Sequence, residues 1–468
     1  MSAIVNNELI YKEKDLPLGS TRQMAQFESI KGTMIGGSRA IINIPNLRNG
    51  FLDTADAFVK FSVSTQLLGA NLPSWDGSGF IVNPDAAILS AAGGVSMIRA
   101  IEIYSNSAIV SRIDNSNYLS SILSIADSSL NSQDAASVIA GNSLSEEGTL
   151  IGNSVCRTWG YPIADTSGTK DTIATLPTMT FCINNNILSF LGDGCMCPIF
   201  GIKNLQLQIE FESDVRVSYV GQKDAVTAAK NCTITSGTNT FSNVSYCAPV
   251  VTMDDSSMES VIKENGFGSK NVMWSGVNHH VSVIQLSTAE QNATLDNLTK
   301  LVPANRFTSL KNITLGAFDS PDANGQTDLC IPRISVNSLQ YRINGNEYPQ
   351  QKIDTVSKCV QNTIACYSTN SNSVGTTFMN SVGTALNYRQ VLPAATRVVS
   401  ARGVIGLNLE TWSESDAVSG LDTTQSDTEA NISTNGATAV SNSQLCFVST
   451  YDTVYVLNAE GILSASYN

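Results

Sequence analysis

The stretch Val336-Asn-Ser-Leu-Gln-Tyr-Arg-Ile343, the pair Asn344-Gly345 and the stretch Glu347-Tyr-Pro-Gln-Gln-Lys-Ile353 decide the fold. Apolar residues alternate with polar ones toward the end of the first stretch, which is the period of a strand with one buried face. Asn-Gly between two such runs is a strong hairpin signal. These residues therefore predict an antiparallel β-hairpin.

A second hairpin is predicted 240 residues earlier, over residues 96–113, with its turn at 105–107. Setting Ile113 on Ile353 also places Ile103 on Ile343. Each hairpin is followed by a helical pattern, at residues 117–125 and 356–366. The same offset places Ile41 on Val281 and Ile44 on Ile284, in the first strand expected in each half, although the residues between them match poorly. A hairpin and a helix at one offset, with partial support from a strand, indicate a duplicated fold.

Other segments complete each half. Alternating or β-branched runs predict strands at residues 40–45, 57–64, 179–183, 205–211, 215–220, 244–251, 398–409 and 445–456. Residues 254–265, with Gly266 after them, predict a short linker helix. Two polar stretches, 126–175 and 413–442, are expected to be long surface loops.

Short strands, hairpins and little helix are typical of jelly-roll or sandwich domains. We therefore expect an all-β fold of two tandem jelly-roll β-barrels, a double jelly roll, with short helices and long surface loops. The expected divisions are an N-terminal arm (1–30), a first jelly roll (31–254), a linker helix (255–270) and a second jelly roll (271–468).

The composition restricts the partners. Charged residues make up 14% of the 468 residues and the net charge is −13. Because no basic stripe is present to neutralise phosphates, direct nucleic-acid binding is not expected. No run of about 18 apolar residues predicts a membrane span. The first residues do not resemble a secretory signal, so the ten cysteines are expected to be reduced thiols.

The sequence offers few groups for chemistry. The two histidines, His279 and His280, are adjacent, and in a strand their side chains would point to opposite faces. Cys195 and Cys197 are separated by one residue, not by the two typical of zinc motifs. The acidic loop at 319–328 fails the calcium-loop spacing. We therefore expect no catalytic residues, no metal site and no cofactor, although a pair of carboxylates meeting in the fold stays possible.

A family resemblance lies in residues 339–351, 406–410, 419–422 and 450–458. With the two-barrel pattern, they resemble the double jelly-roll major capsid proteins of double-stranded DNA viruses, especially virophages and polinton-like viruses. The pattern covers nearly the whole chain, and the first half departs from it most. The resemblance implies homotrimeric, pseudo-hexagonal capsomers that tile an icosahedral shell, with minor capsid and penton proteins as partners. It also implies a virion location after assembly in the host cytoplasm or nucleus, with the loops outside and the arm underneath.

Two other classes stay open. A carbohydrate-binding or tail-fibre β-protein would use exposed aromatic residues, but the four tryptophans, Trp75, Trp159, Trp274 and Trp412, are scattered. A glycoside hydrolase on a β-scaffold would lose activity on removal of single carboxylates.

Overall fold

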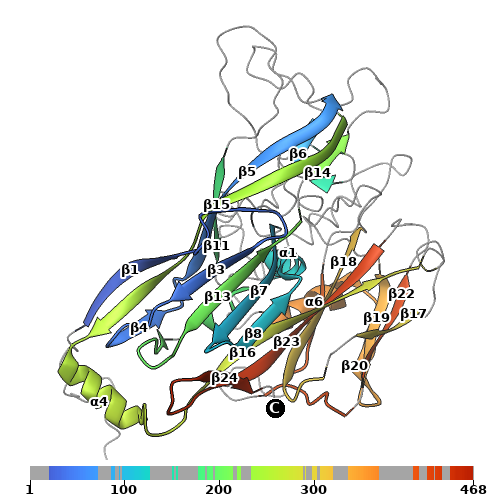
Figure 1. Ribbon diagram of the computed structural model, residues 1–468. Coiled ribbons are helices and arrows are strands. Elements are labelled where there is room, and N and C mark those ends of the chain that lie inside the picture. Colours follow the sequence, from blue (N-terminus) through green and yellow to red (C-terminus); the bar gives the residue numbers. More distant parts are fainter. Residues whose placement is uncertain are drawn as a thin grey trace, which may run out of the picture.

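The structure of the protein is a computed structural model. It describes residues 20–71, 86–89, 94, 97–126, 150–151, 154–155, 178–184, 187–192, 196–213, 219–222, 233–287, 290, 298–302, 306–319, 336–367, 404–410, 419–425, 427–434 and 443–466. These residues form two β-sandwich barrels that lie side by side (Figure 1).

The first barrel consists of two facing sheets. The larger sheet has the order β11 (Met179–Asn184), β5 (Phe58–Asn71), β15 (Thr233–Met253), β4 (Gly50–Asp53) and β12 (Met196–Cys197), and β1 (Ser20–Glu28) and β2 (Thr33–Ile35) also pair with β15. The smaller sheet has the order β3 (Arg39–Ile44), β13 (Leu205–Phe211), β7 (Ile98–Ser105) and β8 (Ala108–Asp114). In β13 the buried and half-buried residues alternate strictly, as the sequence predicted.

The second barrel repeats this plan. One sheet has the order β16 (Val272–Gln285), β23 (Ser443–Leu457), β18 (Leu310–Asp319) and β21 (Ile405–Asn408), with β24 (Leu463–Ser466) also on β23. The other has the order β17 (Leu298–Val302), β22 (Thr428–Thr434), β19 (Val336–Ile343) and β20 (Asn346–Ile353). By position in the sheets, β8 therefore corresponds to β20, β15 to β23 and β1 to β16.

The two hairpins predicted from sequence are confirmed. β7 pairs with β8, and β19 pairs with β20, both antiparallel. Each turn has two successive residues with positive φ, Asn106 and Ser107 (49° and 69°) and Asn344 and Gly345 (51° and 79°). This is the backbone of a type I′ turn, which matches the twist of the flanking strands.

The helices are confirmed too. α1 (Ser116–Ala126) follows the first hairpin and α6 (Val356–Tyr367) follows the second. The linker helix α4 (Asp255–Asn265) begins after Asp254, whose carboxylate accepts a hydrogen bond from the Ser257 amide at 2.7 Å. It ends at Gly266, which has a left-handed φ of 74°. A 3₁₀ turn, η4 (Ser189–Leu191), precedes β12.

Part of the predicted repeat was wrong. The 240-residue offset placed β3 on residues 281–284, which belong to β16. The counterpart of β3 in the sheet order is β17, because β3 pairs with β13 and β17 pairs with β22. Loops of different length separate equivalent strands, so a single offset holds only for the hairpin and its helix.

Two other expectations need correction. Residues 428–434 were expected within a polar loop, but they form β22, a strand between β17 and β19. Its apolar face consists only of Ala430 and Ile432. Two apolar residues are too few to show the alternation of a strand in a segment that is otherwise polar. Residues 20–28 were expected in the N-terminal arm, but they form β1 on the edge of the larger sheet. Of its residues only Phe27 is buried, which leaves no alternating signal.

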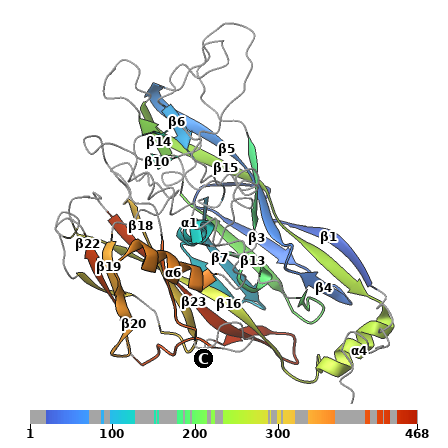
Figure 2. The same ribbon diagram turned by 180° about the vertical axis from the view of Figure 1, so that it is seen from behind.

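The remaining loop predictions are tested only in part. Most of 126–175 lies outside the described residues, apart from the short pair β9 (Leu150–Ile151) and β10 (Ser154–Val155). The predicted strand at 215–220 is described only from β14 (Tyr219–Gln222), which pairs with β6 (Ala86–Leu89). Residues 398–403 of another predicted strand also lie outside. Figures 1 and 2 show β6 and β14 beside the far ends of β5 and β15, at the opposite end of the molecule from α4.

Candidate assembly surfaces

Among the described residues, those that the sequence offered for chemistry form no metal-binding group. In β16, the Nδ1 atom of His279 lies 3.1 Å from the Thr450 hydroxyl, and burial lowers the pKa of this imidazole to about 4. The His280 ring packs 6.0 Å from the Phe307 ring. Cys197 is buried in β12, whereas Cys195 and residues 320–328 lie outside the described residues. Within the described part, no three His, Cys, Asp or Glu side chains are grouped so as to hold a metal ion.

In the described part of the chain, the tryptophans form no cluster that would serve as a sugar-binding platform, because Trp274 alone lies there. Trp274 packs with its ring 5.9 Å from the Tyr455 ring and is partly buried. Trp75, Trp159 and Trp412 lie outside the described residues. Among the described helices, none is long and apolar enough to cross a membrane.

In the described part of the chain, an apolar seam joins the two barrels. One hydrophobic core lies within the second barrel, but the other is shared by both halves. The second barrel contributes to this shared core the buried residues Val281, Phe318, Val404, Cys446, Val448, Tyr455, Leu457 and Leu463. Burial of one such large side chain contributes roughly 1.5–3 kcal/mol. An interface of this apolar kind holds two domains in one fixed arrangement.

A buried chain of polar side chains crosses the seam. The side-chain amide of Asn278 in β16 donates a hydrogen bond to the Ser111 hydroxyl of β8 at 3.1 Å. Ser111 donates to the Ser189 hydroxyl at 3.0 Å, which lies 2.9 Å from the Tyr455 hydroxyl of β23. All four side chains are buried. Because an unpaired buried polar group is costly, this chain selects one register of the two barrels.

Further contacts fix the ends of the seam. Tyr118 of α1 packs edge-on against Phe318 at 5.0 Å and donates to the Gln444 side chain at 2.8 Å. At the other end, the Lys203 amide donates to the Gly461 carbonyl at 2.8 Å. The first barrel thus presents β8 and α1 to the second, and the second presents β16, β23 and β24.

An ion-pair ladder stiffens the sheet that carries β8. The Glu102 carboxylate, only 4% exposed, lies 3.2 Å from both Arg39 of β3 and Arg112 of β8. It also accepts a hydrogen bond from the Tyr104 hydroxyl at 2.8 Å. Arg39 bonds Glu210 of β13, and this bond raises the pKa of the arginine. The ladder therefore links all four strands across the sheet.

The counterparts of the seam strands are exposed. β1 corresponds to β16, yet of its residues only Phe27 is buried and Met24 is 59% exposed. β20 corresponds to β8, yet of its residues only Ile353 is buried. Figure 1 shows β1 and β20 toward opposite lateral ends of the molecule, with the seam between them. At one end, β1 therefore exposes the surface that β16 buries in the seam. At the other end, β20 exposes the surface that β8 buries there.

Comparison with known proteins agrees with this architecture. No protein-family model matches the chain, and no curated protein matches it. Solved structures match along nearly the full length. A chain of the Sputnik virophage cryo-EM structure has a TM-score of 0.61 and 13% identity, covering 100% of this chain and 93% of that chain.

Two other solved structures are of a viral capsid and a viral capsid protein. The PBCV-1 virus capsid has a TM-score of 0.58 and 9% identity, with 98% of this chain and 99% of that chain covered. The mavirus major capsid protein has a TM-score of 0.53 and 11% identity, with 99% and 93% covered. The protein thus has the double jelly-roll fold found in viral capsid proteins, and the predicted fold class is confirmed.

Sequence reasoning did not find the seam. Ser111, Ser189, Asn278 and Tyr455 are far apart in the chain, and none stands in a recognisable motif. The one usable signal was the duplication, which implies that two similar barrels must pack against each other.

Proposed function

We propose that this protein is the major capsid protein of an icosahedral double-stranded DNA virus. The observation that carries the proposal is the double jelly-roll fold, which the chain shares over nearly its whole length with viral capsid proteins. The residue-level likeness in the second half supports the same assignment. No group of residues in the described part favours an enzymatic role over this one.

We further propose that the capsomer is a homotrimer joined head to tail. Inside one chain, β8 of the first barrel faces β16 of the second. Between chains, β20 of one copy would face β1 of the next, which repeats the same relation of barrels. Two different surfaces at opposite ends form a heterologous contact, and such contacts give closed rings when the rotation allows. Three chains supply six barrels, the pseudo-hexagonal unit that the resemblance implies.

The partners follow from this arrangement. Trimers would contact neighbouring trimers in the shell, and minor capsid and penton proteins would complete it. The protein would then be located in the virion after assembly in the host cell.

The test is the mass of the purified protein. Mass photometry should give about 150 kDa, three times the chain mass of 49.8 kDa. Met24→Asp on β1 should shift the population toward the monomer, because it places a charge in the proposed contact. Leu301→Asp is the matched control: Leu301 is 55% exposed, and β17 is separated from β20 by two strands. A monomer for the unaltered chain at all concentrations would refute the trimer.

A further inference from the structure

The linker helix α4 has little cover. Its apolar residues Met258, Val261 and Ile262 are spaced three and four apart, so they share one face. Of the helix residues only Met258 is buried, and Ile262 is 36% exposed. Figures 1 and 2 show α4 at the edge of the molecule, outside both barrels. A helix of eleven residues is marginal in water unless its apolar face is packed.

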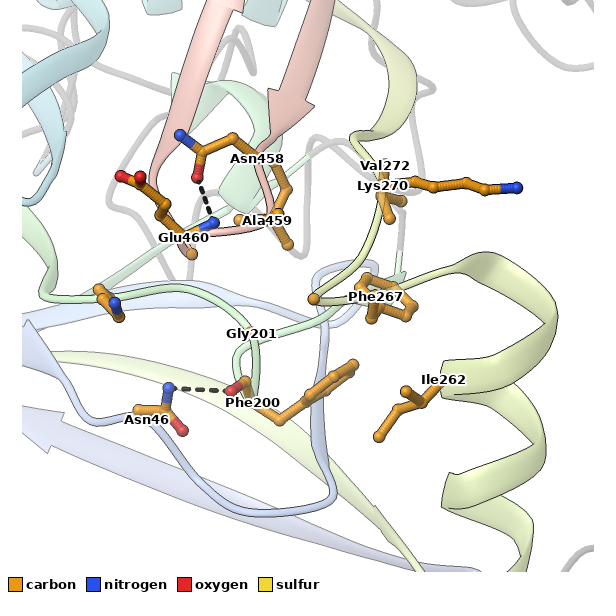
Figure 3. Close-up of a pocket in the computed structure, with 14 residues that line it drawn as sticks. Asn46, Phe200, Gly201, Ile262, Phe267, Lys270, Val272, Asn458, Ala459 and Glu460 are labelled. Carbon is orange, nitrogen blue, oxygen red and sulfur yellow. Dashed lines mark hydrogen bonds between the residues drawn. The ribbon is translucent and has the colours of Figure 1, made fainter.

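A hollow of about 300 Å³ lies next to Ile262. Its wall comes from four parts of the chain. The first barrel contributes Asn46 and the loop at 200–203, the linker and the start of β16 contribute residues at 262–272, and the second barrel contributes the turn at 457–461. In Figure 3, Phe200, Phe267 and Ile262 lie close together, and Asn458 and Glu460 lie on the second-barrel side. The hollow therefore suits an apolar side chain, which would contact Phe200, Phe267 and Ile262. The backbone of the same segment could form hydrogen bonds with the polar residues on the second-barrel side.

The walls of the hollow are already ordered. The Phe200 and Phe267 rings meet edge to face at 4.9 Å. The Asn458 side chain accepts hydrogen bonds from the amides of Glu460 at 3.0 Å and Ile462 at 2.9 Å, which holds the turn in shape. A preformed site loses little entropy when it is filled.

The chain's own N-terminal segment enters the structure at this helix. Ser20, the first residue of β1, pairs with Met253, and Asp254 caps α4. The 19 residues before Ser20 could span up to roughly 60 Å, whereas α4 is roughly 16 Å long. This segment carries apolar residues at positions 4, 5, 9, 10 and 11. Because it is tethered beside the helix, its effective concentration there is high.

We propose that residues 4–11 of the N-terminal segment cover the apolar face of α4 and insert a side chain into the hollow of the same copy. The segment would then connect the first barrel, the linker and the second barrel at one place. This inference goes beyond the capsid assignment and does not depend on trimer formation.

Photo-cross-linking in the full-length protein tests the proposal. Benzoylphenylalanine in place of Ile262 should cross-link to residues 1–19, and the same group in place of Leu301 should not. In a mixture of isotopically heavy and light copies, the linked peptides should come from one copy. Cross-links that join two copies, or none to residues 1–19, would overturn the proposal.

A second measurement avoids the unnatural residue. Ile10→Asp in the full-length protein should speed hydrogen exchange of the amides at 258–268 by roughly tenfold or more, because local opening exposes that helix. The amides of β13 should be unchanged. Equal exchange in both proteins would count against the proposal, whatever the oligomeric state found by mass photometry.

Discussion

The polar chain across the seam makes a quantitative prediction for Tyr455→Phe. The substitution keeps the ring, which packs 5.0 Å from Phe190 and 5.9 Å from Trp274, and removes only the hydroxyl. Ser189 then loses a partner at 2.9 Å in a buried place. Ser189 keeps the hydrogen bond from Ser111, so the substitution removes one buried hydrogen bond, and we expect a loss of about 1 kcal/mol in the free energy of unfolding.

The assay is urea unfolding at one fixed protein concentration, because oligomer formation would otherwise shift the apparent stability. Tyr246→Phe serves as the matched control, since this buried hydroxyl donates to the Leu191 carbonyl at 2.8 Å inside the first barrel. Both variants should lose stability. Only Tyr455→Phe should also speed hydrogen exchange in β16, on the other side of the seam.

A double-mutant cycle with Ser189→Ala isolates the bond itself. We expect the two substitutions together to cost less than the sum of the single effects, by about 1 kcal/mol, because they remove the two partners of one hydrogen bond. Additive effects, or a Tyr455→Phe protein as stable as the unaltered chain, would show that the polar chain does not join the barrels.

Three further predictions concern stability. The pKa of His279 is lowered from 6.5 to about 4, so the folded state favours the neutral imidazole and its contribution to stability is fully present above pH 6.5 and is lost as the pH falls toward 4. The free energy of unfolding in urea should decrease by roughly 3 kcal/mol between pH 7 and pH 4 because of this group. His279→Asn should lack most of this decrease. Glu102→Gln should lower the free energy of unfolding by about 1–3 kcal/mol, because Arg39 and Arg112 lose their shared carboxylate. Asp114→Asn is the control: it weakens the exposed ion pair with Arg112 and should lower the free energy of unfolding by under about 1 kcal/mol. Gly420→Ala should cost more than about 2 kcal/mol in calorimetry, since its Cβ would lie 2.5 Å from the Ser309 carbonyl carbon, whereas Gly32→Ala meets no atom within 4 Å.

Local patterns were enough to predict much of the fold. The two hairpins, the helices after them and the capped linker helix depend on residues close together in sequence, so turn signals and periodicity reveal them. β22 and β1 were missed because their apolar residues are too few to show a period. The strand offset failed because loops of unequal length separate equivalent strands in the two barrels.

The candidate surfaces were harder to foresee. The seam depends on residues such as Ser111 and Tyr455, which meet only after both barrels have formed. Their side chains look ordinary in sequence, and only the fold reveals that they are buried together. The exposed counterparts β1 and β20 became recognisable once the strand order of both barrels was known.

Electron microscopy of the purified full-length protein tests the central claim most directly. We expect particles with three-fold symmetry and a hexagonal outline, in which six barrels form a ring and β20 of each copy faces β1 of the next. Single two-barrel particles at every concentration, or a ring in which β1 and β20 both face solvent, would contradict it.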